Sequence, residues 1–257
     1  MNAQPIRVSD PLENHLLAAL PAAEWRRLQL HLEPIDLPSG KVLIQSGRPP
    51  AHLVFPTTAI VSLLCTTQDG LTAEIAVVGN DGAVGISLVM GAAATSPGEA
   101  VVQSAGHGYR LSAHVAQEET KRFGPAFGIL LRYTEAMMAQ VAQTAICNRY
   151  HSIDQQLCRR LLLGLDRLRT DDLAMTQERV ATLLGVRRES VTAAALKLQE
   201  AGVIRYHRGL ISVMDRPSLE KRTCECYAMA KKEQDRLLPI PRLAGRLGRA
   251  AASFATA

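Results

Sequence analysis

The spacing of apolar and polar residues changes twice along the chain. Apolar residues recur at helical spacing over Asn14–Leu20 and Glu24–Leu32, with Pro21 starting the second segment. From Ile35 this period gives way to short β-rich runs, and after Ser112 it returns. The pattern therefore predicts two N-terminal helices, a β-rich middle and a helical C-terminal half.

The β-rich middle contains six predicted strands separated by turn residues. Asp69-Gly70 lies between two apolar runs and predicts a hairpin with a tight primed turn, because such a turn needs positive φ. Many short, closely spaced strands are typical of an antiparallel barrel or roll. The predicted strands are Lys41–Ile44, His52–Phe55, Ile60–Thr66, Thr72–Val78, Ala100–Gln103 and Tyr109–Leu111.

A narrow apolar stripe runs along the helical segment after the strands. Its members alternate in steps of four and three residues, which is the spacing of a seam covered by one other helix. We interpret it as a coiled-coil contact between two copies of the chain; packing onto the helix's own domain is the alternative. The stripe consists of Phe127, Leu131, Thr134, Met138, Val141 and Ala145. A short hinge, His151–Asp154, leads to a further apolar helix over Leu157–Leu168.

The stretch Met175–Gly202 predicts two helices joined by a sharp turn at Gly185. Thr176 is the expected N-cap of the first helix. The second helix, from about Arg187 to Ala201, has an inward face at i, i+3, i+4 and i+7 formed by Val191, Ala194, Ala195 and Leu198. A hairpin around Arg208-Gly209 then forms a wing.

Two such helices followed by a wing place the second helix in a DNA major groove. Arg188 suits guanine O6 and N7, Glu189 suits a cytosine amino group, and Thr192 suits a phosphate or a thymine methyl. Between positions 185 and 209, five Arg or Lys and two Glu give a local charge of +3, which favours phosphate binding. The predicted DNA-contacting residues are Thr176, Gln177, Arg187, Arg188, Glu189, Thr192, Lys197, His207 and Arg208. A helical hairpin used for protein contacts is the alternative.

The sequences TQERVATLLGVRRESVT, from Thr176, and LQEAGVI, from Leu198, resemble the helix-turn-helix of the Crp/Fnr family. The recognition helix of that family starts with an Arg-Glu pair, which falls on Arg188 and Glu189. A further Arg usually comes four residues after the Glu, where this chain has Ala193. The resemblance therefore implies a related but not identical operator.

The resemblance covers nearly the whole chain. Pro38–Ile44 with Gly47 is similar to the opening of the family's cyclic-nucleotide-binding-like β-roll, and Gly79–Gly85 matches its glycine-rich turn. The Phe127–Ala145 helix falls where the family has its long dimer helix. The resemblance implies an α+β fold, with an N-terminal antiparallel β-roll, a dimerisation helix and a C-terminal winged helix-turn-helix. It also implies a homodimer on palindromic double-stranded DNA, with RNA polymerase as a further partner if the protein activates transcription.

The chain departs from the family at the effector pocket. Cyclic-AMP-binding members have an acid after the second glycine of that turn and an Arg-Ser pair further on. Here Ile86 follows Gly85, and Gly98 and Glu99 stand at the Arg-Ser positions. We therefore expect a degenerate pocket that does not bind cyclic AMP, and the effector stays unidentified. Iron–sulfur members have an N-terminal cysteine cluster, whereas no Cys precedes Cys65 here, so no cofactor is expected.

Cys224 and Cys226 fall on a polar, basic helix predicted beyond Pro217 and through Gln234. Neighbouring cations would lower their thiol pKa and favour redox sensitivity. Two residues apart on a helix, however, the thiols point about 200° apart and cannot easily share a metal or form a disulfide. The seven His residues are scattered without ligand spacing, so we expect no metal site.

Composition limits the remaining classes of protein. With 257 residues, 47% hydrophobic and 21% charged, the chain is typical of globular proteins, and its net charge of +5 suits a nucleic-acid partner. Five Cys at irregular spacing indicate reduced cytosolic thiols, and no signal peptide or membrane span is evident, so a cytoplasmic protein without a membrane partner is expected. A catalytic cupin-like barrel needs clustered His and Glu, and His52 with Glu74 are too few, so no catalytic residue is assigned.

The sequence thus predicts four parts. They are a β-roll effector domain with the N-terminal helices (1–120), a dimerisation helix (121–152), a winged helix-turn-helix (153–220) and a C-terminal helix with a tail (221–257). The expected function is sequence-specific DNA-binding transcription regulation. The alternative is a regulatory ligand-binding or protein-interaction module with a degenerate helix-turn-helix, against which the retained Arg188 and Glu189 argue.

Overall fold

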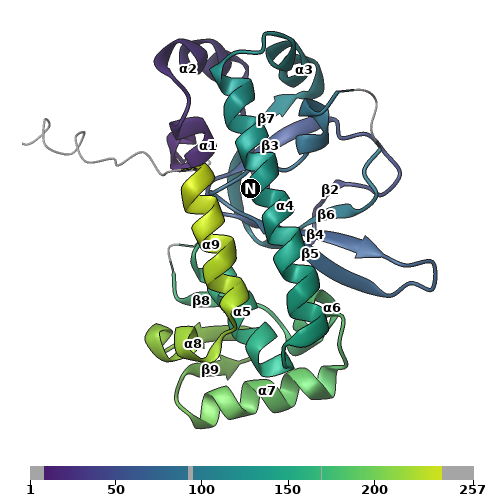
Figure 1. Cartoon of the computed structure of the whole chain (residues 1–257), viewed down its shortest axis with the longest axis vertical. Helices are drawn as coiled ribbons and strands as arrows, with labels where there is room; N and C mark the ends of the chain where they lie inside the picture. The colour runs from purple at the N-terminus through teal and green to yellow at the C-terminus, as the bar shows by residue number, and fades with distance from the viewer. Residues whose placement is uncertain (1–8, 92–94, 169, 239–257) are drawn as a thin grey trace, which may run out of the picture.

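The computed structural model describes residues 9–91, 95–168 and 170–238. Helix α4 (Pro125–Tyr150) runs along the length of the molecule, with the first sheets on one side and the last helix, α9 (Glu225–Leu237), lying beside it (Figure 1). Helices α2 (Ala22–Leu28) and α3 (Ala113–Lys121) lie at one end and α7 (Arg188–Glu200) at the other. The long helix therefore connects the N-terminal and C-terminal ends of the molecule.

Seven strands of the N-terminal half form two antiparallel sheets. One has the order β1-β7-β3 and the other β2-β6-β4-β5. Apolar residues from both sheets, among them Leu37, Val54 and Val102, form one buried cluster, so the sheets enclose a core as in a roll. The strands are β1 (Glu33–Leu37), β2 (Val42–Ile44), β3 (His52–Pro56), β4 (Ile60–Thr66), β5 (Thr72–Val78), β6 (Glu99–Ser104) and β7 (Gly106–Ser112).

The six predicted strands are all present, and the sequence interpretation missed only β1 in this half. Of its five residues Leu37 alone is buried, and Pro34 cannot donate to a ladder, so β1 has neither an alternating pattern nor a central position. It pairs with β7 alone. The predicted hairpin also forms, with Thr66 opposite Thr72. The prediction of a primed turn is wrong, because only Gly70 of the Asp69-Gly70 pair has positive φ (82°).

The N-terminal helices are shorter than their apolar spacing predicts. Helix α1 (His15–Ala18) is a single turn that follows a 3₁₀ segment at Pro11–Glu13. Helix α2 ends at Leu28 and is followed by a second 3₁₀ segment, Gln29–His31. Asn14 caps α1 by accepting from the backbone N–H groups of Leu16 and Leu17. Its side-chain amide also donates to the carbonyls of Pro56 and Gly82, each at 2.8 Å. The buried Asn14 thus attaches this turn to the roll.

Helix α5 (Ile153–Leu165) occupies the centre of the C-terminal half. Ser152 and Gln155 form a capping box that starts it, and every residue from Gln156 to Leu165 is buried. Its leucines belong to one cluster with Ile60 and Val77 of the roll. The roll and the C-terminal half therefore share a hydrophobic core, which explains why no Gly/Pro linker separates them.

Two helices stand where one was predicted beyond Pro217. Helix α8 (Arg216–Arg222) has Pro217 in its first turn, and the extended residues Thr223 and Cys224 separate it from α9. Among the described residues, no helix is both long and apolar enough to cross a bilayer. The predicted tail, with Arg242, Arg246 and Arg249, lies outside the described residues.

Candidate nucleic-acid interface

Helices α6 (Gln177–Leu184) and α7 form the predicted helix-turn-helix. The hydroxyl of Thr176 accepts from the backbone N–H of Arg179 at 3.2 Å, which confirms the predicted N-cap. Gly185 ends α6 in the left-handed backbone conformation (φ 65°), which residues other than glycine rarely adopt. The sharp turn predicted at this glycine is therefore present.

The two faces of α7 divide as the apolar spacing predicts. Val191, Ala194, Ala195 and Leu198 are buried in the core around α5. Arg188, Glu189 and Ala193 are exposed, and Thr192 is half-buried. Helix α7 forms the end of the molecule farthest from α2 and α3 (Figure 1). Its outer face is therefore free to meet a large partner.

The wing consists of β9 (Ile204–His207) and β10 (Leu210–Val213), with β8 (Asp172–Ala174) as a third strand that the sequence interpretation missed. Arg208 and Gly209 both have positive φ (46° and 80°), as a two-residue type I′ turn requires. The hydroxyl of Tyr206 accepts from the backbone N–H of Gln177 at 3.2 Å. The wing and α6 are thus held together.

Several predicted DNA-contacting side chains already have partners within the chain. Thr192 donates to Gln177 at 2.8 Å, so these two predicted residues lie together. Lys197 pairs with Asp154 at 2.8 Å, and Arg188 lies 3.9 Å from Glu178. Both ion pairs are exposed, so either cation can exchange its carboxylate for a phosphate at low cost. The other predicted DNA-contacting residues Arg187, His207 and Arg208 are exposed. Arg205, a further cation of the wing, is exposed as well.

A buried ion pair joins the roll to α5. The guanidinium of Arg160 lies 2.5 Å from the carboxylate of Glu74 on β5, and both side chains are under 10% exposed. Glu74 also accepts from Ser62, while Arg160 donates to Gln103. A buried charge is tolerated when it is paired and hydrogen-bonded, so these residues depend on one another.

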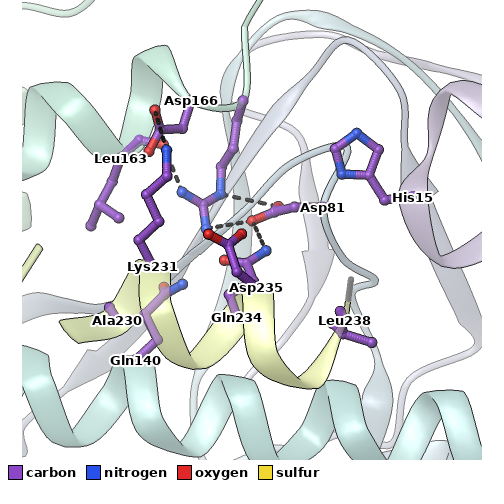
Figure 2. Close-up of a pocket in the computed structure, with 11 residues that line it drawn as sticks. His15, Asp81, Gln140, Leu163, Asp166, Ala230, Lys231, Gln234, Asp235 and Leu238 are labelled. Atoms are coloured by element: carbon purple, nitrogen blue, oxygen red, sulfur yellow. Dashed lines mark hydrogen bonds and ion pairs between the residues drawn. The ribbon is translucent and has the colours of Figure 1, made fainter. Parts of the chain in front are cut away.

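A second buried pair joins the glycine-rich turn of the roll to the end of α5. Arg167 lies 2.5 Å from Asp81, which also accepts from Gln234 of α9 at 2.6 Å. Arg167 and Asp81 line a small cavity of about 100 Å³. Figure 2 shows Asp81 in its wall, with Gln234 beside it and His15 and Lys231 also lining the cavity. The turn expected near the effector pocket is therefore in direct contact with the C-terminal half.

The predicted seam residues differ in exposure. Leu131 and Met138 are exposed (45% and 67%), Ala145 is exposed, and Thr134 and Val141 are half-buried. Phe127 is half-buried and packs against the chain's own core. The opposite side of α4, with Ile129 and Tyr133, packs into the chain's own core. The exposed part of the stripe, with Leu131, Met138 and Ala145, is therefore available to a second copy.

The predicted effector residues have structural reasons for their identity. Gly85 has φ 95°, and a Cβ there would lie 2.6 Å from the His52 carbonyl. A Cβ on Gly98 would lie 2.3 Å from the Leu64 carbonyl, so no larger residue fits without movement of β4. Ile86 starts a 3₁₀ turn (Ile86–Val89), and Glu99 starts β6 opposite Leu64.

The expectation that Cys224 and Cys226 point apart is wrong. Cys224 is the N-cap of α9 with extended backbone (φ −85°, ψ 166°), so the two thiols are not both on a helix. They gather with Cys147 and His151 at the end of α4. For Cys226 the expected lowering of the thiol pKa is wrong, because burial raises its pKa to about 11. The spacing of His151, the C-cap residue of α4 four positions after Cys147, was the signal that sequence reasoning overlooked.

Comparison with known proteins identifies the class of protein. Residues 155–222 match the family model of the Crp-like helix-turn-helix domain. This match spans α5, the two helices, the wing and α8. Residues 155–222 are therefore a Crp-like helix-turn-helix domain.

Solved structures of Crp/Fnr regulators share the fold of about three quarters or more of the chain. A Crp/Fnr-family regulator from Eubacterium rectale is 17% identical, with TM-score 0.62, covering 80% of this chain and 96% of that one. The Crp/Fnr-family regulator TTHA1359 from Thermus thermophilus is 18% identical, with TM-score 0.58, covering 74% of this chain and 97% of that one. The c-di-GMP-responsive global regulator CLP from Xanthomonas campestris is 16% identical, with TM-score 0.58, covering 75% of this chain and 99% of that one. No curated protein sequence matches the chain. The predicted resemblance to Crp/Fnr regulators is confirmed for the fold and for the helix-turn-helix.

Proposed function

We propose that the protein is a transcription regulator that binds specific DNA sequences as a homodimer. The single observation that carries the proposal is the outward face of α7, which presents Arg188 and Glu189 at the start of a helix followed by a basic wing. A major groove admits one such helix, and its first residues reach the base edges. Arg187, Lys197 and Arg208 supply phosphate contacts around it.

The homodimer follows from the outward stripe on α4. A row of exposed apolar side chains on a helix is stabilised when a second helix covers it. Two copies related by a twofold axis along α4 would each present an α7, and the DNA site would then be palindromic.

The roll supplies regulation without cyclic AMP. Ile86 has no acceptor for a ribose hydroxyl, and a carboxylate at Glu99 repels a phosphate. The close approach of Gly98 to the Leu64 carbonyl leaves no room for an arginine side chain at that position. Whatever the signal, the Asp81–Arg167 and Glu74–Arg160 pairs provide a direct connection from the roll to α5.

A gel-shift assay with full-length protein and promoter DNA at two salt concentrations tests the proposal. We expect a specific complex that survives competitor DNA, and an affinity that falls as salt rises because counterions are released. The matched variant Glu189→Ala should weaken the specific complex, whereas Glu118→Ala on α3 should not. A chain without salt-dependent DNA binding would instead be a protein-interaction module.

A further inference from the structure

Four side chains with metal-binding atoms meet where α4 ends and α9 begins. Cys147 and His151 come from the end of α4, and Cys224 and Cys226 from the start of α9. The three sulfurs and one ring nitrogen all lie within 4.8 Å of one another. The three thiols are buried, and the His151 side chain is only 14% exposed. The arrangement is thus a compact, nearly closed set of four ligands.

The local structure explains why four residues so far apart in sequence converge. Cys147 and His151 are four residues apart, so they lie on one side of the last turn of α4. Thr223 and Cys224 are extended, which turns the chain before α9 and sets the Cys224 thiol beside that of Cys147. Cys226, in the first turn of α9, faces the same point.

The spacing between the ligand atoms fits one tetrahedral ion. Sγ of Cys147 lies 3.5 Å from Sγ of Cys224, and Sγ of Cys226 lies 3.5 Å from Nδ1 of His151. Zinc–sulfur bonds of about 2.3 Å and zinc–nitrogen bonds of about 2.0–2.1 Å place tetrahedral ligand atoms roughly 3.6–3.8 Å apart. The other pairs of ligand atoms lie within 4.8 Å of one another, and they would move closer together around the ion to complete that geometry. A cluster of several iron atoms needs more widely separated thiolates.

A carboxylate orients the histidine for this role. Nε2 of His151 lies 3.2 Å from Oε1 of Glu225, while Nδ1 faces Cys226. A metal-bound histidine usually donates its second N–H to a carboxylate, which fixes the ring and its tautomer. Gln156 further holds this turn by donating to the carbonyls of Cys147 and His151.

A buried cation beside the cluster supplies charge balance. Arg159 is 6% exposed, and its Nη2 donates to Thr144 at 2.9 Å. Its Nε is buried without a hydrogen-bond partner among the described residues. A divalent ion held by three thiolates and a neutral imidazole carries one negative charge, which would stabilise this guanidinium. Three free thiols would leave the charge of Arg159 without compensation from the cluster.

We propose that Cys147, His151, Cys224 and Cys226 form a closed four-ligand site for zinc. Three thiolates and one imidazole are a ligand set that zinc prefers, and four protein ligands leave no position open for a substrate. The ion would fasten the start of α9 to the end of α4, beside the entry to α5. It would therefore stiffen the connection between the dimer helix and the DNA-binding half.

Metal analysis of the reduced, full-length protein tests the site. We expect one zinc per chain after purification, removed by a chelator with a loss of thermal stability. Titration of the stripped protein with Co²⁺ should give the intense d–d bands of tetrahedral cobalt and a thiolate charge-transfer band, both abolished by added Zn²⁺. A reduced chain that takes up neither ion in stoichiometric amount would overturn the proposal, even if Cys147 and Cys224 form a disulfide on oxidation.

Variants then locate the ion. Cys226→Ser and His151→Ala should each lower zinc affinity at least tenfold, and Glu225→Gln should lower it about 10–100-fold through the loss of its carboxylate. Cys65→Ser, a thiol of the roll outside the cluster, is the matched control and should keep the full zinc content. Equal losses in Cys65→Ser and Cys226→Ser would contradict the assignment. If Cys226→Ser fails to fold, the cobalt spectrum of the unaltered chain decides alone.

Discussion

Arg208 occupies a conformation that an arginine seldom adopts, with φ 46° in the wing turn. The turn leaves its side chain exposed to solvent in the wing, where a phosphate contact is the natural role. Arg208→Ala should therefore weaken binding to all DNA sequences about equally and reduce the salt slope by about one unit per subunit. Binding isotherms over a salt series measure this slope. Arg110→Ala, which removes an exposed cation from the roll, is the control; a change of base preference in Arg208→Ala would contradict the assignment.

Asp81 supports the joint between the roll and α5. Asp81→Asn removes the charge that balances the buried Arg167 while keeping the volume of the side chain. Loss of one partner of a buried pair costs about 3–5 kcal/mol, so the free energy of unfolding should fall by that order. Denaturant unfolding measures it. Glu33→Gln is the matched control, because its pair with Arg110 is exposed and worth at most about 1 kcal/mol; equal effects would show that the buried pair has no special role.

At the residue scale the sequence predicts local roles better than distant partners. The cap at Thr176 and the turn at Gly185 follow from neighbouring residues, and both are present. Arg160 and Glu74 are 86 residues apart, and nothing in their local pattern pairs them. Arg160 stands among the apolar residues of α5. Because arginine is rarely buried, the sequence pattern does not predict that its side chain points into the core. Such contacts depend on how the elements pack, which periodicity does not determine.

Helix α4 combines two different faces. One side packs into the chain through Ile129 and Tyr133, and the other presents Leu131 and Met138 to solvent. Val141→Arg and Met138→Arg should each place a charge in the proposed seam and dissociate the dimer. Light scattering should report a monomer for both variants. Leu30→Arg, at an exposed apolar residue near the N-terminus, should stay dimeric.

A dimer that persists in both seam variants would remove this face of α4 from consideration. The interface would then have to lie elsewhere, and the twofold relation between the two α7 helices would lose its structural basis.

At the element scale, strong periodicity predicted the structure and weak periodicity did not. The helices α6 and α7 match their predicted bounds within about one residue because their buried faces repeat at helical spacing. The strands β4 and β5 match because turn residues separate two apolar, β-branched runs. The edge strand β1 and the three-residue β8 bury little and were missed. The break before α9 was missed because its cause is the packing of Cys224 against α4, and no Gly or Pro marks it.

The whole molecule resembles a sensor fold whose usual ligand does not suit its residues. We expect cyclic AMP neither to bind nor to change DNA affinity, because Ile86, Gly98 and Glu99 stand where cyclic-AMP-binding members have an acid, an Arg and a Ser. Calorimetry with cyclic AMP should give no binding heat. Micromolar binding at one ligand per subunit would contradict this view of the pocket.

The architecture of the whole chain follows from its order of patterns. A β-rich segment, a striped helix and a helix-turn-helix with a wing are predicted from the patterns, and the resemblance of the motifs from Thr176 and Leu198 implies the Crp/Fnr arrangement, which the fold comparisons confirm. The shared core around α5 and the two buried ion pairs lie between these parts. They were not predicted, because each involves residues from separate elements.

Selection of binding sites from random DNA duplexes tests the central claim most directly. The unaltered protein should select a palindrome whose half-sites are centred about one duplex turn apart. Arg188→Ala should cost roughly 1–3 kcal/mol at that site and make one base position in each half-site degenerate, because its planar fork suits a single guanine. A protein that selects no common sequence, or an Arg188→Ala variant whose base preference is unchanged, would contradict the account in which α7 reads the groove.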